Sequence, residues 1–324
     1  DGANTTVYID IGDDTWHALE VTASGWRTIQ SAEVPVRFIR SSGMLPLPTP
    51  QPGSIDDLAA AITVPRFNED GTPNRAFQGM VAWLLQATRV DGPFPILALN
   101  GQHGAAKSSR TRQLCSLLDP HTATLRVLSR DDRDLLIAAR HSWLQAKDNV
   151  SGLTGWQSDA FCRLATGGAI STRTLYTDGE ETILNAKRPV TMNGIVSFVE
   201  RLDLVDRTIL ATLPHIPEDA RLPESELDAD YEARRPKALG ALLDVISSGL
   251  ARSGTRHLQR LPRMADFAEW IVACCPALGW DPEDFLDWYA NTRVDLERET
   301  LDSAPIVAPL LALISEAGGN LELI

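Results

Sequence analysis

One short segment, Gly-Gln-His-Gly-Ala-Ala-Lys-Ser at positions 101–108, most constrains how this chain folds. It follows the apolar run 94–100 and precedes residues 110–118, so the pattern predicts a strand, a glycine-containing loop and an amphipathic helix. A Lys-Ser pair at the start of such a helix is typical of a P-loop, in which main-chain amides and the helix N-terminus bind phosphate groups. The segment therefore predicts a phosphate site on an α/β scaffold.

The chemistry expected of this loop assigns a role to each of its residues. Lys107 is expected to reach the β- and γ-phosphates of ATP, and Ser108 to be a ligand of Mg²⁺. Ala106 departs from the motif, because a second glycine normally stands there and a methyl group restricts the backbone. An ordinary Gly/Ala-rich strand-to-helix turn is the alternative interpretation. The residues predicted to bind the nucleotide are Gly101, Gln102, His103, Gly104, Ala105, Ala106, Lys107, Ser108 and Ser109.

Composition limits the classes of protein to which the chain can belong. Its 324 residues are enough for one large domain or for two or three smaller ones. The net charge of −13 argues against a broadly basic surface that wraps duplex DNA, although a ring with a few basic residues in its pore stays compatible with it. No apolar run is long enough to span a membrane. The four cysteines form no C-x-x-C pair, so we expect free core thiols and a cytoplasmic location.

The order of predicted elements divides the chain into three parts. Residues 1–52 form a small β-rich module with a proline-rich linker, residues 53–217 the P-loop core, and residues 218–324 a helical region. Strands that alternate with helices predict a mainly parallel, five-stranded core sheet covered on both faces. Strands are predicted at 6–11, 16–21, 26–29, 34–38, 95–99, 124–128, 142–147, 188–193 and 207–213. Helices are predicted at 76–88, 110–118, 131–139, 156–165, 224–250, 264–275, 282–296 and 303–317, with a further one beginning at Ser54 and with Pro236 breaking or kinking the helix at 224–250.

An acidic residue ends the strand that follows the P-loop by about forty residues. In P-loop ATPases an aspartate such as Asp148 holds the Mg²⁺ shell. The alternative is that Asp148 caps the next helix, a role that Ser151 could fill instead. Asn149 stands where a glutamate would polarise the attacking water, and an asparagine cannot accept a proton from that water.

Two later residues extend the predicted site. Asn193 ends the strand 188–193, where a polar side chain can reach between the P-loop and the γ-phosphate; the alternative is a simple Asn-Gly turn. Arg207 opens the last strand, where an arginine can stabilise charge in a neighbouring subunit's site. A surface ion pair with Asp203 or Asp206 is the alternative.

A β-hairpin is predicted over residues 169–182, between paired glycines and an Asp-Gly turn. Taken in order, the P-loop, the acid strand, the Thr-Gly-Gly…Arg-x-Leu-Tyr hairpin, the Arg-Pro-x-x-x-Asn strand and the Leu-x-Asp-Arg segment resemble the motor domain of phage and mobile-element primase-helicases. These are superfamily 3-type helicases within the AAA+ ATPases. The resemblance covers about residues 75–250.

The resemblance implies a role for each matching residue. Lys107 and Ser108 would bind ATP and Mg²⁺, Asp148 would be the Walker B acid, Asn193 the sensor of the lytic water, and Arg207 an arginine finger acting in trans. It further implies a hexameric ring and a primase domain in the full-length protein. The hairpin would grip single-stranded DNA, or its arginine would support the subunit interface. The candidate DNA-binding residues are Thr172, Arg173 and Lys187.

Three functions therefore compete. The first is an ATP-driven DNA helicase or translocase. The second is a nucleotide-binding switch or assembly module with weak hydrolysis, which Ala106 and Asn149 favour. The third, a P-loop kinase, fits the hairpin and the position of Arg207 poorly.

Overall fold

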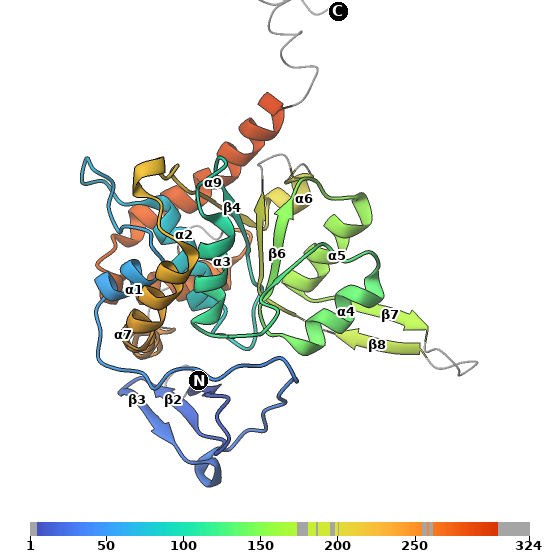
Figure 1. The fold of residues 1–324 in the computed structure, drawn as a ribbon. Coiled ribbons are helices and arrows are strands. Elements are labelled where there is room, and N and C mark those ends of the chain that lie inside the picture. Colours follow the sequence, from blue (N-terminus) through green and yellow to red (C-terminus); the bar gives the residue numbers. More distant parts are fainter. Residues whose placement is uncertain are drawn as a thin grey trace, which may run out of the picture.

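The computed structural model describes residues 5–173, 181–185, 187–194, 198–199, 201–254, 258 and 262–303. A central sheet with helices on both faces forms the body of the molecule, and a small second sheet lies beneath it in the view of Figure 1. The helical C-terminal part packs beside the body. The predicted α/β class, with a β-rich N-terminal module and a helical C-terminal part, is confirmed.

The central sheet has five parallel strands in the order β10-β4-β9-β6-β5. Because all five run in one direction, their carboxyl ends meet at one edge, and β9 lies between the P-loop strand β4 and the acid strand β6. β6 begins at Gln145 rather than at Ser142, and the predicted strand 124–128 contracts to the short edge strand β5. The bounds are Ile96–Asn100 (β4), Leu125–Arg126 (β5), Gln145–Val150 (β6), Val190–Gly194 (β9) and Thr208–Thr212 (β10).

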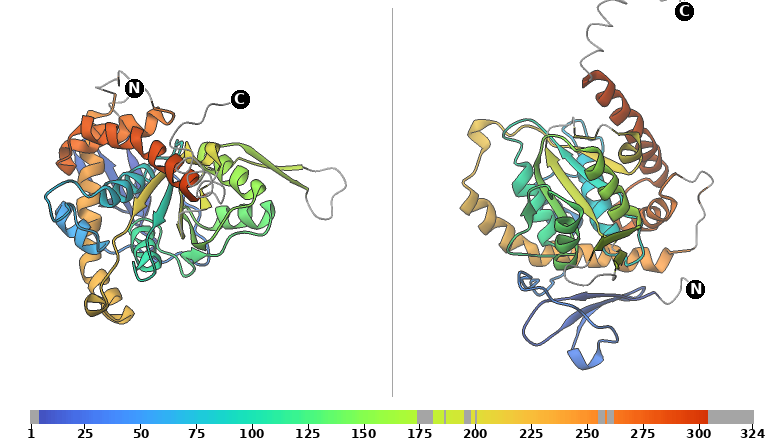
Figure 2. Two further views of the ribbon diagram at one scale, coloured as in Figure 1. Left: turned by 90° about the horizontal axis from the view of Figure 1, so that it is seen from above. Right: turned by 90° about the vertical axis from the view of Figure 1, so that its right-hand side faces the viewer.

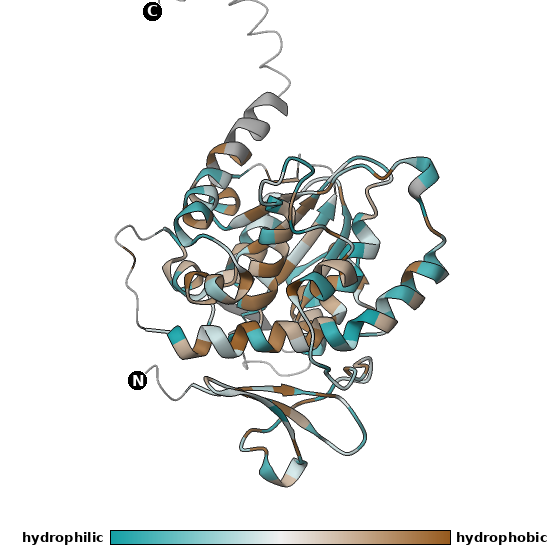
Figure 3. Ribbon diagram, turned by 90° about the vertical axis from the view of Figure 1, so that its left-hand side faces the viewer, coloured by the Kyte–Doolittle hydropathy of each residue, from teal (hydrophilic) through white to brown (hydrophobic). Residues whose placement is uncertain are grey.

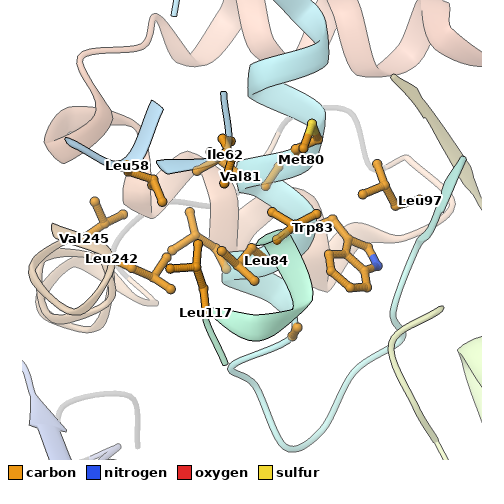
Figure 4. Close-up of a cluster of buried hydrophobic side chains, with 14 of the residues drawn as sticks. Leu58, Ile62, Met80, Val81, Trp83, Leu84, Leu97, Leu117, Leu242 and Val245 are labelled. Carbon is orange, nitrogen blue, oxygen red and sulfur yellow. The ribbon is translucent and has the colours of Figure 1, made fainter. Parts of the chain in front are cut away.

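Helices cover both faces of this sheet, as is usual for a parallel sheet. On one face α2 and α3 pack with α1, α7 (Glu224–Arg252) and α8 (Ala265–Leu278) around Trp83 and Leu97, as Figure 4 shows for part of this cluster. On the other face α4, α5 and α6 pack around Phe161 and Met192. The bounds are Ile55–Ala61 (α1), Arg75–Gln86 (α2), Lys107–Ser116 (α3), Asp132–His141 (α4), Gly155–Thr166 (α5) and Leu202–Val205 (α6).

The N-terminal sheet is an antiparallel meander of β1 (Val7–Asp10), β2 (Ala18–Thr22) and β3 (Gly25–Ile29). The strand predicted at 34–38 is wrong. A 3₁₀ turn at Ser31–Glu33 ends the meander, and Pro35 has no N–H group with which to extend the ladder.

The helix α7 (Glu224–Arg252) lies between the body and the N-terminal sheet (Figure 3). The sequence predicts a break or a kink at Pro236; the break does not occur, because the helix runs on through this residue. The proline-rich linker crosses the helix here: the Gln51 amide donates to the Pro236 carbonyl at 3.0 Å, and a Cβ on Gly240 would lie 1.8 Å from the Gln51 carbonyl oxygen. The glycine therefore allows the linker to approach the helix closely.

Two further helices, α8 (Ala265–Leu278) and α9 (Pro282–Ser303), complete the described chain. The helix predicted at 303–317 lies outside the described residues, apart from its first residue. Within the described part, no helix is both long and apolar enough to cross a membrane. The main hydrophobic cluster contains residues of all three predicted segments, so the boundaries at 52 and 217, which remain a prediction, do not separate independent cores.

The predicted hairpin exists as β7 (Ala169–Arg173) paired with β8 (Glu181–Asn185). It projects from the body near α4 (Figure 2). It joins the end of α5 to the start of β9, so it leaves the molecule at the amino edge of the sheet. The predicted tip lies outside the described residues.

Candidate nucleotide-binding site

The predicted P-loop joins the carboxyl end of β4 to the first turn of α3. Gly104 has φ +82°, and Ala106, the N-cap residue of α3, has φ 52° and ψ 33°. The φ angles of both residues are positive and lie in the left-handed region, where glycine is the usual residue. Ala106 therefore adopts the backbone conformation that glycine favours, at a cost of about 1 kcal/mol.

The Lys107 side chain folds back over the loop. Its Nζ donates to the carbonyl oxygens of Gly101 at 2.6 Å and Gln102 at 3.1 Å. The ammonium charge thus lies inside the turn of the loop, next to the amides that start α3. A cation beside free amides at a helix N-terminus is an arrangement that attracts phosphate.

Ser108 and Asp148 meet at the carboxyl edge of the sheet. The Ser108 hydroxyl donates to Oδ1 of Asp148 at 2.7 Å. The capping alternative for Asp148 is wrong, because Thr154 caps α5 together with Gln157, and Ser151 does not. A hydroxyl and one carboxylate fit Mg²⁺, which proteins usually hold with one or two carboxylates while phosphates and water supply the other ligands. Across the described residues, no group of three or more His, Cys, Asp or Glu side chains offers a self-sufficient metal site.

Asn193 links the acid strand to the P-loop helix. Its side chain is 1% exposed; Oδ1 accepts from the Asn149 amide at 3.0 Å, and Nδ2 donates to the Thr111 hydroxyl at 3.0 Å. The Thr111 hydroxyl in turn donates to the Lys107 carbonyl at 2.7 Å. Asn193 is therefore part of β9 and not of a free turn, and its amide holds two neighbouring elements in register. Its predicted role as a water sensor remains a prediction.

Asn149 occupies a bulge in β6. The pairing register with β9 shifts between Lys147 and Val150, and Asn149 itself has φ 53°, a conformation that asparagine tolerates better than most residues. Its side chain is exposed. Gly194 lies opposite the bulge, where a Cβ would come within 1.9 Å of the Val150 carbonyl oxygen.

A buried arginine that the sequence reasoning missed supports the loop. The Arg110 side chain is 6% exposed and donates to the Ala105 carbonyl at 3.1 Å and to the Thr63 carbonyl at 3.0 Å. Burial lowers the pKa of its guanidinium. Its position one turn into α3 is the signal that could have found it, because the side chain of a helical residue lies over the preceding turn.

The remaining predicted residues lie at the opposite edge of the sheet. Arg207 precedes β10, its guanidinium donates to the Asp203 main-chain carbonyl, and its Nε is buried without a partner among the described residues. Lys187, at the foot of the hairpin, donates to the Gly92 carbonyl at 3.0 Å. Thr172 and Arg173 belong to β7. None of these four belongs to the P-loop edge of its own chain.

Comparison with known proteins identifies a family. A family model described as "Actinomycete integrative conjugative element replication protein" matches residues 72–294. No curated protein matches the chain. Among solved structures, the apo C-terminal region of NrS-1 is 10% identical with a TM-score of 0.42, and the match covers 73% of this chain and 65% of that one. A JCV helicase bound to a substituted acetamide is 12% identical with a TM-score of 0.32, covering 73% and 72%. The assignment of the site rests on the geometry of this chain.

Proposed function

Because the chain belongs to the family of actinomycete integrative conjugative element replication proteins, we propose that it is an ATP-hydrolysing motor that translocates on or unwinds DNA. The observation that carries the proposal is the meeting of Lys107, Ser108 and Asp148 at one edge of the sheet, with the Ser108 hydroxyl 2.7 Å from the Asp148 carboxylate. A cation and a hydroxyl from a P-loop, with a carboxylate from a nearby strand, are the groups that Mg²⁺-ATP requires.

We assign a different role in ATP hydrolysis to each group of site residues. The loop amides and Lys107 would bind and orient the phosphates, while Ser108 and Asp148 would hold Mg²⁺, which neutralises charge on the phosphate oxygens. Asn193 would keep Asp148 in position through its bond to the next residue's amide. Catalysis of this kind depends mainly on positioning and charge, so small displacements of these groups should slow it strongly.

The rest of the proposal concerns assembly. Arg207 would act in the site of a neighbouring copy, in a head-to-tail ring that we propose to be a hexamer in the cytoplasm. The hairpin, with Thr172, Arg173 and Lys187, would contact single-stranded DNA. A primase domain would belong to the same full-length protein. Loss of the γ-phosphate that both copies contact would loosen the interface and move the hairpin.

Phosphate release, measured with and without single-stranded DNA, tests this function. We expect DNA to stimulate release by the wild-type protein, and Lys107→Ala to abolish release because the loop loses its phosphate-binding cation. Lys237→Ala, which removes an exposed lysine of α7, is the matched control and should behave as wild type. The proposal is contradicted if Lys107→Ala still releases phosphate, or if single-stranded DNA does not change phosphate release by a confirmed oligomer.

A second function, a nucleotide-dependent switch with weak hydrolysis, is favoured by Asn149. This residue follows the Walker B acid with an exposed amide, which can orient water but cannot accept its proton. The switch predicts tight ATP binding with negligible phosphate release at saturating DNA. Ready turnover by the wild-type protein would exclude it.

A further inference from the structure

The segment between β10 and α7 passes across the P-loop. β10 pairs in parallel with β4, with Thr212 opposite Asn100, and the Leu213 amide continues the pairing by donating to the Asn100 carbonyl at 2.8 Å. The chain therefore leaves the sheet directly beside the loop. It then makes a 3₁₀ turn at Glu218–Ala220 and enters α7.

Two basic side chains of this segment contact the loop. Nδ1 of His215 lies 3.1 Å from the His103 carbonyl oxygen. The Arg221 guanidinium lies against Gly104, where a Cβ would come within 2.6 Å of Nη2 and 3.2 Å of Cζ. Gly104 thus serves two needs: it takes a positive φ, and it leaves room for the guanidinium.

Arg221 is held loosely by its own surroundings. Its Nε donates to the Ile216 carbonyl at 3.4 Å, Nη1 lies 3.9 Å from a Glu218 carboxylate oxygen, and the side chain is 45% exposed. Charge-assisted hydrogen bonds of full strength are about 2.7–2.9 Å long. Arg110, by contrast, is buried and donates to two main-chain carbonyls at 3.0–3.1 Å. The Arg221 guanidinium therefore retains donors for a stronger acceptor.

We propose that Arg221 binds the β/γ-phosphate end of the nucleotide in cis, as a second cation beside Lys107. The inference rests on the proposed nucleotide site and goes beyond it by adding a residue from the far side of the loop. Lys107 supplies a point charge, whereas a planar guanidinium offers paired donors that match two phosphate oxygens. Because Arg221 precedes α7, a phosphate bound by it would also connect the nucleotide to that helix.

Equilibrium titration with fluorescent ATP, competed by unlabelled ATP and AMP, tests the proposal on the full chain. The proteins are wild type, Lys107→Ala, Arg221→Gln, Arg221→Lys and Arg234→Gln. Arg234 is the matched control, because it is an arginine of α7 with the same 45% exposure and an ion pair to Asp230. We expect Arg221→Gln to weaken ATP binding about tenfold or more and to leave AMP binding and the melting temperature unchanged. Arg221→Lys should fall between Arg221→Gln and wild type, and Arg234→Gln should match wild type.

The possible outcomes separate the two proposals. ATP binding that is lost in Lys107→Ala but unchanged in Arg221→Gln overturns the role of Arg221 and leaves the nucleotide site intact. Equal weakening of ATP and AMP also overturns it, because a phosphate ligand must discriminate between them. A wild-type protein that binds no nucleotide overturns both proposals.

Discussion

The carboxyl and amino edges of the central sheet differ: at the first, one chain supplies a hydrogen-bonded set of site residues, and at the second, within the described residues, it does not. At the carboxyl edge, hydrogen bonds of 2.7–3.0 Å connect Ser108 to Asp148, and Asn193 to Thr111 and to the amide after Asp148. At the amino edge lie Arg207 and the base of the β7–β8 hairpin, and the hairpin projects away from the body (Figures 1 and 2). One edge is a connected site, and at the other edge the hairpin projects from the body.

The length of the strands explains why this difference matters. A strand of five residues, such as β10, spans about 16 Å. Arg207 at the start of β10 therefore cannot touch a phosphate held at the end of β4 in the same chain. If both edges take part in one reaction, they must come from different copies, as in a head-to-tail ring.

The largest expected effect comes from Arg207→Ala. If the amino edge acts only in trans, phosphate release should fall about 1,000-fold, because an arginine finger contributes 10³ or more to turnover. Nucleotide affinity should stay within about twofold of wild type. Arg201→Ala, which removes an exposed arginine paired with Asp159 and Asp203, is the control and should keep wild-type turnover.

Mixing variants sharpens the same comparison. Neither Arg207→Ala nor Lys107→Ala is expected to turn over alone. A mixed ring contains interfaces that join an intact Lys107 to an intact Arg207, so mixing should restore part of the activity. No recovery in rings shown to contain both variants would break the assignment of the two edges to different copies.

Asn193→Ala should have the next largest effect, and it acts on the connected edge. It removes the acceptor of the Asn149 main-chain amide and one of the two hydrogen bonds of the Thr111 hydroxyl, which should cost about 2–3 kcal/mol of unfolding free energy. Displacement of the adjacent Asp148 should slow turnover about tenfold or more. Urea unfolding and phosphate release measure the two effects.

The control for Asn193 lies on the same strand. The Thr191 hydroxyl is buried without a partner among the described residues, so Thr191→Val should be neutral or slightly stabilising and should not slow turnover. Equal losses in both variants would mean that β9 responds to any substitution and that the Asn193 bonds have no special role.

Lys147 lies between the two edges, buried in β6 with 1% of its surface exposed. Burial, assisted by the Arg126 guanidinium, lowers its pKa to about 8. The folded protein therefore loses this proton while the unfolded chain still holds it, so stability should rise from about pH 8 to about pH 10.5. Lys147→Met should add about 3 kcal/mol at neutral pH and abolish that rise. Urea unfolding at several pH values measures both effects, with exposed Lys237→Met as the control; an unchanged pH profile would refute this account.

The sequence predicted the P-loop edge because its chemistry is local. Lys107 and Ser108 follow from one motif, and Asp148 and Asn193 could be placed beside them because parallel strands share a carboxyl edge. The same rule could have located Arg221, since β10 ends at that edge too. The local pattern could not show that the Asn193 side-chain amide bonds both to the Asn149 main-chain amide and to the Thr111 hydroxyl. The first of these bonds depends on the bulge at Asn149.

The strand predicted at 34–38 and the break predicted at Pro236 fail for different physical reasons. Residues 34–38 alternate as a strand would, but Pro35 cannot extend the ladder, and Arg40 instead ties this segment to Asp10 at 2.6 Å. Pro236 is a helix breaker by propensity, yet α7 continues because it is packed between the body and the N-terminal sheet. At Pro236 tertiary contacts outweigh the local preference, and no window of sequence contains them; at 34–38 the proline itself is the local signal against a strand.

Ala106→Gly should produce the smallest effect, and it tests the one position where the loop departs from its motif. Ala106 holds φ 52° and ψ 33°, so glycine would relieve strain of about 1 kcal/mol, partly offset by the greater entropy of the unfolded chain. We expect a small rise in melting temperature and unchanged or slightly tighter ATP binding. Ala105→Gly is the control: Ala105 is buried and is not among the positive-φ residues, so its replacement should destabilise. If Ala106→Gly instead destabilised the protein, the methyl group would contribute packing that exceeds the strain, and Ala106 would be an adaptation of this loop rather than a tolerated departure.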